Sequence, residues 1–235
     1  MERRSSLRPE LMDDPGLELD ATEGALRDIE KVHRWVGNRA LWRLLLPVLA
    51  EAGRSQRVLD VGTGNGVVAA QAIDRAQRRD IKISAIGLDR KLAHLILGRD
   101  RGHRQLRVVG DALALPFADG AFDASFSTFF QHHFLPDDGA RALAEMRRVS
   151  SRAAIVVDIR RSRIGGLLGR LVLTLLRVGA VASYDGRVSL DQGWSMNEVQ
   201  GATPAGAIRS LARRWPFRWA LEMAPELRSG PTGGD

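Results

Sequence analysis

Three glycines at every second position follow an acidic residue early in the chain. An apolar run ends in Asp60, and Gly62, Gly64 and Gly66 come directly after it. Glycine suits a ligand-binding turn because its backbone adopts positive φ and leaves N–H groups accessible that a Cβ would block. Open α/β sheets bind ligands in the crevice at the carboxyl ends of their strands. We therefore predict that Asp60 and the glycine turn hold a ligand with cationic or hydroxyl donors.

Two further acids end apolar segments in the same way. Asp89 follows the alternating residues 81–88, and Asp111 follows residues 106–110. A carboxylate can accept hydrogen bonds from two neighbouring hydroxyls or from an amine. The structural alternatives are a helix N-cap for Asp89 and a turn residue for Asp111. For Asp89 the two roles are compatible.

A pair of histidines, His132 and His133, lies in the segment 127–134, which comes off another apolar run. An imidazole with a pKa near neutral can take a proton from a phenol or enol as a reaction proceeds. The alternative is that the pair orients its loop or packs beneath it. No acid stands at a recognisable ligand spacing from the two histidines, so we predict no metal site.

The elements that must position these residues alternate between strand and helix. The pattern predicts strands at 57–61, 81–88, 106–110, 122–128 and 153–158, with helices at 67–79, 91–98 and 137–149 between them. Strands that alternate with helices at this spacing favour right-handed βαβ units. The predicted fold class is α/β, with a doubly wound, mostly parallel sheet.

The segments on either side of this core are predicted to flank the site. Residues 24–52 have helical spacing and should form two helices that break near Gly37. The apolar stretch 164–182 should form a lid or surface helix. Its length also fits a transmembrane span, but two arginines make such a span costly. The runs 208–215 and 217–223 should form a terminal strand pair.

The composition is that of an ordinary globular protein. The 235 residues are 44% hydrophobic and 27% charged, which fits one domain with a substantial core. There are no cysteines, which excludes disulfides, thiolate zinc sites and cysteine nucleophiles. The formal net charge of +7 comes from arginines scattered among acids, without the clustered basic stripe of nucleic-acid-binding proteins. We therefore expect no nucleic-acid partner.

We predict a flexible segment at residues 1–20, a single domain at 21–228 with a lid insert at about 160–205, and a flexible tail at 229–235. Both ends are rich in charge, proline or glycine. The amino terminus has no secretory hydrophobic core, so we expect a cytoplasmic protein without an integral membrane span. The oligomeric state stays open, with a homodimer among the alternatives.

The spacing Asp-x-Gly-x-Gly-x-Gly at residues 60–66 resembles the first motif of class I S-adenosylmethionine-dependent methyltransferases. It departs from the dinucleotide fingerprint, in which the third glycine would stand at the position of Val67. The resemblance implies the Rossmann-like methyltransferase fold, a seven-stranded sheet with N-terminal helices and a helical lid insert after strand five. Residues 8–15 and 158–163 also resemble a bacterial subgroup associated with polyketide-type secondary metabolism.

The resemblance implies S-adenosylmethionine as the cofactor and a role for each motif. Asp60 would lie near the methionine amino group, Asp89 would bind the ribose hydroxyls, and Asp111 with Ala112 would bind adenine. The general base would be His132 or His133. The implied substrate-binding residues are Trp35, Phe130 and Tyr184. The full cofactor-binding set is Asp60, Gly62, Gly64, Gly66, Asp89, Arg90, Asp111, Ala112, Ser127, Thr128 and Phe129.

The predicted function is transfer of a methyl group to a small lipophilic or aromatic, polyketide-like acceptor by in-line displacement at oxygen. Carbon methylation of a quinone-like molecule is the nearest alternative. A non-catalytic cofactor-binding partner in a biosynthetic complex and a nicotinamide oxidoreductase are the others; turnover and NADH binding separate them. A nucleic-acid methyltransferase is disfavoured because residues 128–131 lack an Asn/Asp-Pro-Pro-aromatic sequence.

Overall fold

The computed structural model of the chain describes residues 6–14, 16–50, 54–100, 102 and 105–226, apart from the side chains of residues 35 and 36. The helices are η1 (Leu11–Asp13), α1 (Leu19–Val36), α2 (Arg39–Ala50), α3 (Val67–Gln77), α4 (Leu92–Asp100), η2 (Gln131–His133), α5 (Pro136–Val149), α6 (Arg163–Leu175), α7 (Ala180–Gln192) and α8 (Met196–Ala202). The strands are β1 (Gln56–Val61), β2 (Ile83–Asp89), β3 (Leu106–Val109), β4 (Phe122–Thr128), β5 (Ser150–Ile159), β6 (Ile208–Arg214) and β7 (Arg218–Met223).

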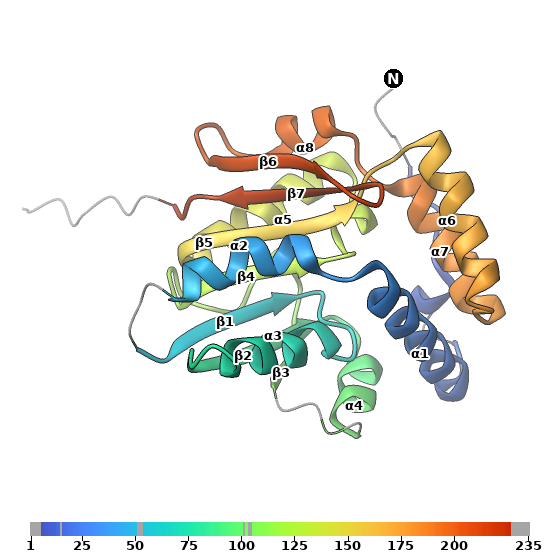
Figure 1. Cartoon of the computed structure of the whole chain (residues 1–235), viewed down its shortest axis with the longest axis horizontal. Helices are drawn as coiled ribbons and strands as arrows, with labels where there is room; N and C mark the ends of the chain where they lie inside the picture. Colours follow the sequence, from blue (N-terminus) through green and yellow to red (C-terminus); the bar gives the residue numbers. More distant parts are fainter. Residues whose placement is uncertain (1–5, 15, 51–53, 101, 103–104, 227–235) are drawn as a thin grey trace, which may run out of the picture.

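The strands of the described chain form one seven-stranded sheet in the order β3-β2-β1-β4-β5-β7-β6. The strands from β3 to β5 in this order are parallel, and β7 is antiparallel to both β5 and β6. In Figure 1 the arrowheads of β1 and β5 therefore point the same way, whereas β7 runs back. The strand order reverses between β1 and β4, where doubly wound sheets bind their ligands. The predicted α/β fold with a mostly parallel sheet is confirmed.

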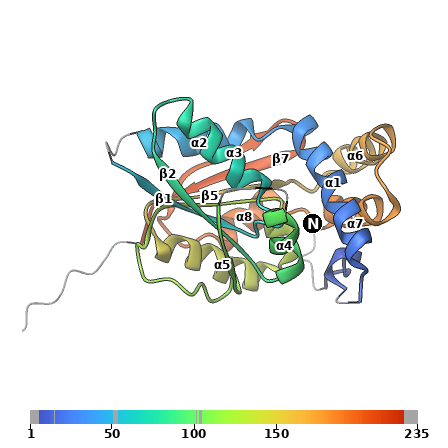
Figure 2. The ribbon, with the colours of Figure 1, turned by 90° about the horizontal axis from the view of Figure 1, so that it is seen from below.

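Helices cover both faces of the sheet. Figure 2 shows α2 and α3 on one face and α5 and α8 on the other. On the first face, Leu41 and Leu45 of α2 are fully buried with Ile155 of β5. On the second, Leu143 and Met146 of α5 are buried in a separate apolar cluster. Strands covered on both faces are apolar almost throughout, and the two clusters fix the strands whose ends carry the polar residues.

The edge of the sheet at which β1 and β5 end is covered by α1, α6 and α7 (Figures 1 and 2). The N-terminal segment with η1 lies against α7. The backbone N–H groups of Leu11 and Met12 donate to the Asp185 carboxylate of α7, at 2.6 and 3.0 Å. Asp185 is 3% exposed, so it satisfies two backbone donors in a place that water barely reaches.

The prediction of a flexible N-terminus is wrong for residues 6–14. In addition to the Asp185 contacts, the backbone N–H of Arg8 donates to Gln192 Oε1 at 2.6 Å. Polar acceptors on α7 therefore order a stretch whose composition alone suggests mobility. Residues 1–5 and the predicted tail 229–235 lie outside the described residues.

The insert after β5 forms two helices, α6 and α7, in place of the predicted single helix over 164–182. Glycines let the two helices pack closely: a Cβ at Gly169 would meet the side chain of Leu190, and one at Gly186 would meet Leu173. Each helix has 13 residues. Among the described residues, no helix has both the length and the apolar character that crossing a bilayer requires.

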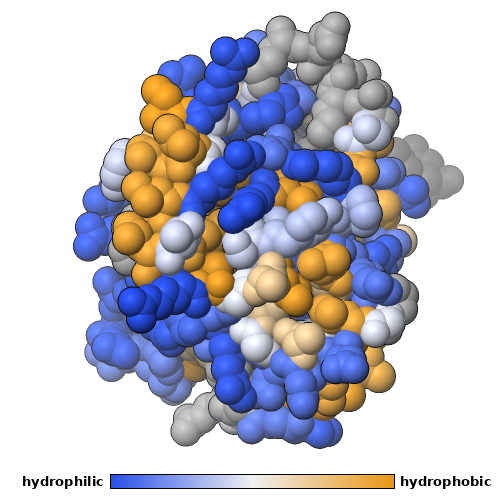
Figure 3. Space-filling model, turned by 90° about the vertical axis from the view of Figure 1, so that its right-hand side faces the viewer, coloured by the Kyte–Doolittle hydropathy of each residue, from blue (hydrophilic) through white to orange (hydrophobic). Residues whose placement is uncertain are grey.

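One side of α6 presents apolar side chains to solvent. Ile164, Leu167, Leu171 and Leu175 follow one another at spacings of three or four residues and are between 52% and 71% exposed. Figure 3 shows apolar side chains gathered on this side of the molecule among hydrophilic ones. Exposed apolar patches mark contact sites for partners, lipids or ligands, so this face of α6 is more than an ordinary solvated surface.

The remaining element predictions are largely confirmed. The break near Gly37 separates α1 from α2, and the terminal strand pair forms as β6 and β7. The predicted solvated turn over 98–104 is wrong at its start, because Gly98 is buried inside α4. A glycine is needed there, since α4 packs directly on the backbone of the glycine turn.

We predict that Gly98→Ala destabilises the fold. A Cβ at this position would lie 2.0 Å from the backbone carbonyl oxygen of Asn65, so either α4 or the turn must shift. Overpacking of this kind costs about 1–3 kcal/mol, to be measured as the free energy of unfolding in urea.

Gly166→Ala is the matched control. Gly166 also lies inside a helix, α6, and among the described atoms nothing outside its own helical neighbourhood lies within 4 Å of a Cβ placed there. This variant should be stabilised by up to about 1 kcal/mol, because alanine has the higher helix propensity. Equal changes in the two variants would contradict the packing argument.

Candidate functional site

A cavity of about 750 Å³ opens where the parallel strands end. Its walls come from the glycine turn after β1, the ends of β2 and β4, the N-terminal segment, α1, and the insert helices α6 and α7. The volume falls within the range of small-molecule sites, about 300–1,000 Å³. Carboxylates and glycine backbone line one part of the wall, and apolar side chains line much of the rest.

The glycine turn has the backbone conformation that its sequence predicts. Gly62, Gly64 and Gly66 have φ angles of 71°, 56° and 82°, in the left-handed region that glycine adopts without strain. Gly62 also makes room for the ring of Phe130, which would lie 2.4 Å from a Cβ. Gly62 and Gly64 line the cavity, whereas Gly66 begins α3 and faces the side chain of Gln105. The predicted cofactor contact of Gly66 therefore lacks support from the geometry.

Asp60 is a buried carboxylate in the cavity wall, with 2% exposure. Its Oδ2 accepts a hydrogen bond from Thr63 Oγ1 at 2.7 Å. Burial raises the pKa of Asp60 to about 7, and the charge of Asp89 adds to this effect, while the hydrogen bond from Thr63 opposes it. A cationic group bound beside the carboxylate would favour its ionised form. Asp60 is thus suited to an ammonium group of a ligand.

Asp89 connects the end of β2 to both the glycine turn and α4. Its Oδ2 accepts from the N–H of Gly64 at 2.8 Å, and its Oδ1 accepts from the N–H of Lys91 at 2.9 Å. Burial raises the pKa of Asp89, but the neighbouring His94 and these N–H groups outweigh it and hold the pKa below its usual value. Asp89 lines the cavity as an ionised group, so its capping role leaves it available to a ligand.

The remaining predicted cofactor residues are divided between the cavity and the core. Arg90, Asp111, Ala112 and Thr128 line the cavity. Oδ1 of Asp111 accepts from the backbone N–H two residues later at 2.9 Å, which is the turn role considered above. Ser127 is 1% exposed within β4 and is not part of the lining, because successive strand residues point to opposite faces.

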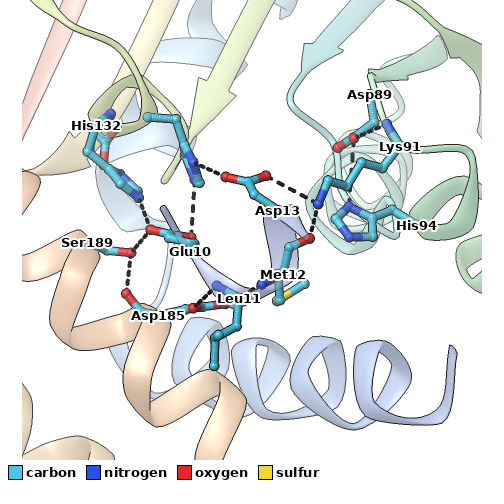
Figure 4. A network of polar contacts seen from close by, with 12 residues as sticks. Glu10, Leu11, Met12, Asp13, Asp89, Lys91, His94, His132, Asp185 and Ser189 are labelled. Carbon is cyan, nitrogen blue, oxygen red and sulfur yellow. Dashed lines mark hydrogen bonds and ion pairs between the residues drawn. The ribbon is translucent and has the colours of Figure 1, made fainter. Parts of the chain in front are cut away.

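Two histidines and three acids form a cluster at one side of the cavity, shown in part in Figure 4. Nδ1 of His132 lies 2.8 Å from Asp158 Oδ1, and its Nε2 lies 3.7 Å from Glu10 Oε1. Nε2 of His133 lies 3.7 Å from Glu10 Oε2, and its Nδ1 lies 3.6 Å from Asp13 Oδ2. The expectation that no acid joins the histidine pair is therefore wrong.

Glu10 and Asp13 are site residues that the sequence does not reveal. They belong to the N-terminal segment, which only the contacts with α7 bring to the loop after β4. Oε1 of Glu10 also accepts a hydrogen bond from Ser189 Oγ of α7 at 2.7 Å. The one signal in the sequence is the resemblance of residues 8–15 to a bacterial subgroup, and that resemblance assigns no role to Glu10.

The acids around His133 favour its charged form. Burial lowers the pKa of His133, but a hydrogen bond to Asp13 and the charges of Glu10, Asp13 and Asp158 raise it to about 9. His133 in turn holds the pKa of Asp13 below its usual range. A protonated imidazole cannot accept a proton, so His133 in this arrangement does not act as a base at neutral pH.

Phe129 and Phe130 line the cavity from the loop after β4. The ring of Phe129 stacks on His33 of α1, with 4.6 Å between centroids, and the guanidinium of Arg218 lies 5.8 Å from the same ring. His33, which the sequence analysis treats as an ordinary helix residue, also lines the cavity. Burial, together with the charge of Arg218, lowers the pKa of His33 to about 4. His33 is therefore a neutral polar group in the wall.

Two predicted substrate residues are not found in the cavity wall. Tyr184 of α7 is 45% exposed and lies outside the lining. The next residue, Asp185, turns toward the N-terminal segment, and consecutive helix residues point about 100° apart. The side chain of Trp35 lies outside the described residues.

Residues 59–157 match the protein family described as "Methyltransferase domain". The match runs from β1 into β5 and includes the glycine turn, Asp89, Asp111 and the histidine pair. Its sheet, with β7 antiparallel beside β5, has the order given above. The chain contains a class I S-adenosylmethionine-dependent methyltransferase domain.

This methyltransferase domain resembles quinone-modifying enzymes in sequence. The chain is 35% identical over 152 residues to the demethylmenaquinone methyltransferase of Deinococcus radiodurans, covering 60% of this chain and 61% of that protein. It is 38% identical over 103 residues to the ubiquinone/menaquinone biosynthesis C-methyltransferase UbiE of Dinoroseobacter shibae, covering 40% and 38%. The chain spans about half the length of the curated relatives it matches.

The fold of the methyltransferase domain recurs in human N-acetylserotonin methyltransferase, a structure solved in complex with SAM. The two superpose with a TM-score of 0.64 over 88% of this chain and 56% of that chain, at 12% sequence identity. At this identity the likeness shows a shared fold.

We predict that His33 makes the stability of the methyltransferase domain pH-dependent. The folded pKa is about 4 and an unfolded histidine titrates near 6.5, so the unfolded chain binds more protons between these values. The stabilisation is present above pH 6.5 and is lost as pH falls toward 4. Allowing for partial exposure of the ring, the loss at pH 5 should be about 1–2 kcal/mol.

The measurement compares the free energy of unfolding of the native chain with that of His33→Phe from pH 7 to pH 5. Phenylalanine retains the aromatic stack on Phe129 but does not titrate. The native chain should lose stability relative to the variant as the pH falls. A difference that stays constant over this range would show that His33 is not held neutral by its surroundings.

Proposed function

We propose that the chain binds S-adenosylmethionine in the described cavity and transfers its methyl group to a lipophilic, hydroxylated aromatic or quinone-like acceptor. The observation that carries this proposal is a single cavity lined by two different sets of residues. Asp60, the glycine turn and Asp89 form a polar part, and the loop after β4 with α6 forms a largely apolar part. Such a division suits a charged nucleoside donor and an apolar acceptor.

The polar part suits the donor in three ways. Asp60 would hold the ammonium group of the methionine moiety, because its buried carboxylate favours a cationic neighbour. The exposed backbone of Gly62 and Gly64 would lie along the ligand, where a Cβ would obstruct it. Asp89 would accept hydrogen bonds from the ribose hydroxyls. Asp111 and Ala112 at the end of β3 would lie beside the adenine.

The apolar part suits a lipophilic acceptor. Leu168, Leu171 and Val172 of α6 line the cavity, and Phe217 and Trp215 extend the lining from the β6–β7 turn. Leu171 and Trp215 are also 52% and 79% exposed, so the apolar lining continues onto the outer face of α6. An acceptor with an apolar ring or tail could keep contact with this continuous surface.

Carbon methylation is our leading assignment because of the relatives. The matched proteins of D. radiodurans and D. shibae are named as a demethylmenaquinone methyltransferase and a quinone-biosynthesis C-methyltransferase. Removing a proton from a ring hydroxyl makes both the oxygen and the adjacent ring carbon nucleophilic. The cluster of Glu10, His132 and His133 supplies charged and imidazole groups beside that hydroxyl. Methylation at oxygen of a polyketide-derived phenol is therefore the alternative product.

The proposal is tested by turnover with S-adenosylmethionine whose methyl group carries ¹³C. The acceptors are a demethylated naphthoquinol, a simple phenol and a polyketide-type resorcinol. S-adenosylhomocysteine should accumulate with the quinol, and the ¹³C chemical shift of the product separates a methyl on carbon from one on oxygen. Tight cofactor binding without product from any acceptor would support a non-catalytic partner, and binding of NADH alone would support the oxidoreductase.

We further predict that Asp89→Ala weakens the binding of S-adenosylhomocysteine by about 1–3 kcal/mol, through loss of charge-assisted hydrogen bonds. Isothermal titration calorimetry measures the affinity. Asp100→Ala is the control, because Asp100 is an exposed acid at the end of the adjoining α4 and should leave the affinity unchanged. Equal affinities for the two variants would refute the role of Asp89.

A further inference from the structure

Three side chains from distant parts of the chain turn their ligand atoms toward one region. Glu10 comes from the N-terminal segment, and His132 and His133 come from η2. One oxygen or nitrogen from each lies within 4.8 Å of the other two. We propose that Glu10, His132 and His133 form a binding site for a divalent transition-metal ion, in place of the metal-free site that the sequence predicts.

The spacing within the cluster is that of metal ligands. Each imidazole Nε2 lies 3.7 Å from a different oxygen of Glu10. A direct N–H···O hydrogen bond would bring these atoms to about 2.7–3.2 Å. Zinc ligands lie about 2.0–2.2 Å from the metal, which places neighbouring ligand atoms roughly 3–3.5 Å apart. The Glu10 carboxylate thus stands at a distance that an ion between the groups can bridge.

The groups behind the three ligands hold them in the orientation that a metal site requires. Metal-binding histidines donate their other ring nitrogen to a carboxylate or carbonyl, which fixes the tautomer. Nδ1 of His132 lies 2.8 Å from the fully buried Asp158, and that carboxylate also accepts the backbone N–H of His132 at 3.0 Å. This leaves Nε2 of His132 directed at Glu10. Ser189 Oγ orients Glu10 by donating to Oε1.

The charges in and around the cluster favour a cation. Within the described network there are four carboxylates: Glu10, Asp13, Asp158 and Asp185. The permanent cations that act on it are Lys91, which contacts Asp13 at 3.3 Å, and Arg218, whose charge acts on Asp158. With both imidazoles neutral, as metal ligands must be, the network has a deficit of two positive charges. A divalent ion removes that deficit.

The donor set identifies the class of metal. Two imidazole nitrogens and one carboxylate suit zinc, iron(II), manganese(II) or cobalt(II), whereas calcium and magnesium prefer sites made of oxygen ligands. Three protein ligands leave coordination positions for a further group. Glu10, His132 and His133 all line the cavity, so that further group can be a molecule bound there.

The chemical use of the ion rests on the proposed function, whereas its binding does not. A hydroxyl of the acceptor that coordinates the ion loses its proton more readily. The O–H bond breaks, the proton passes to solvent, and the oxygen remains bound to the ion as an oxyanion without any change in oxidation state. The acceptor is then nucleophilic when the methyl group is presented to it.

The test is a titration of the full chain, treated first with a chelator, with CoCl₂ and no cofactor or acceptor present. Cobalt(II) in a site of nitrogen and oxygen ligands gives visible d–d absorption whose intensity reports the coordination geometry. One cobalt ion per chain should bind and should be displaced by ZnCl₂. Glu10→Gln and His133→Gln should each weaken binding at least tenfold, and Asp158→Asn should weaken it about 10–100-fold through the orientation of His132.

His94→Gln is the matched control. His94 lines the same cavity but lies beside Asp89, so this variant should bind cobalt as the native chain does. Thermal unfolding of each variant establishes that it is folded, and bound zinc should raise the Tm of the native chain. The proposal is overturned if neither cobalt nor zinc binds saturably, or if binding survives both Glu10→Gln and His133→Gln. Since no acceptor is used, either result leaves methyl transfer untouched.

Discussion

Parallel pairing of the central strands is the constraint on which the rest of this structure depends. Because β1, β2, β4 and β5 run in the same direction, their carboxyl ends share one edge of the sheet. Asp60, Asp89, Thr128 and Asp158 stand at or near those ends. Each strand contributes few polar groups, and it is the common direction that collects them. An antiparallel arrangement of the same segments would divide these groups between two opposite edges.

The second requirement is a cover for that edge. Asp185 of α7 accepts two backbone N–H groups of the N-terminal segment and thereby fixes Glu10 and Asp13 beside the histidine pair. The insert helices themselves pack closely because glycines at 169 and 186 admit leucines of the facing helix. The cavity is therefore closed by segments from both ends of the chain, and its acceptor side is built from residues that the sheet does not position.

Electrostatics divides the cavity into two functional parts. On the donor side, Asp60 is buried with a raised pKa and Asp89 is held ionised by its neighbours, so the pair presents negative charge to a cationic ligand. On the acceptor side, acids surround His132 and His133 and raise the pKa of His133. Between them, His33 is kept neutral against Phe129. The same fold thus provides one environment for a sulfonium donor and another for an acidic hydroxyl.

The sequence by itself determined the sheet, the glycine turn and the acids at the strand ends. These features depend on local spacing: alternation of apolar residues, glycine where φ is positive, and an acid where a strand stops. Only the tertiary structure decided that Glu10 and Asp13 meet the histidines, that His33 lines the cavity, and that Gly66, Ser127 and Tyr184 face away from it. Those outcomes depend on contacts between residues far apart in the chain and on the direction in which each side chain points, and neither leaves a periodic signal in the sequence.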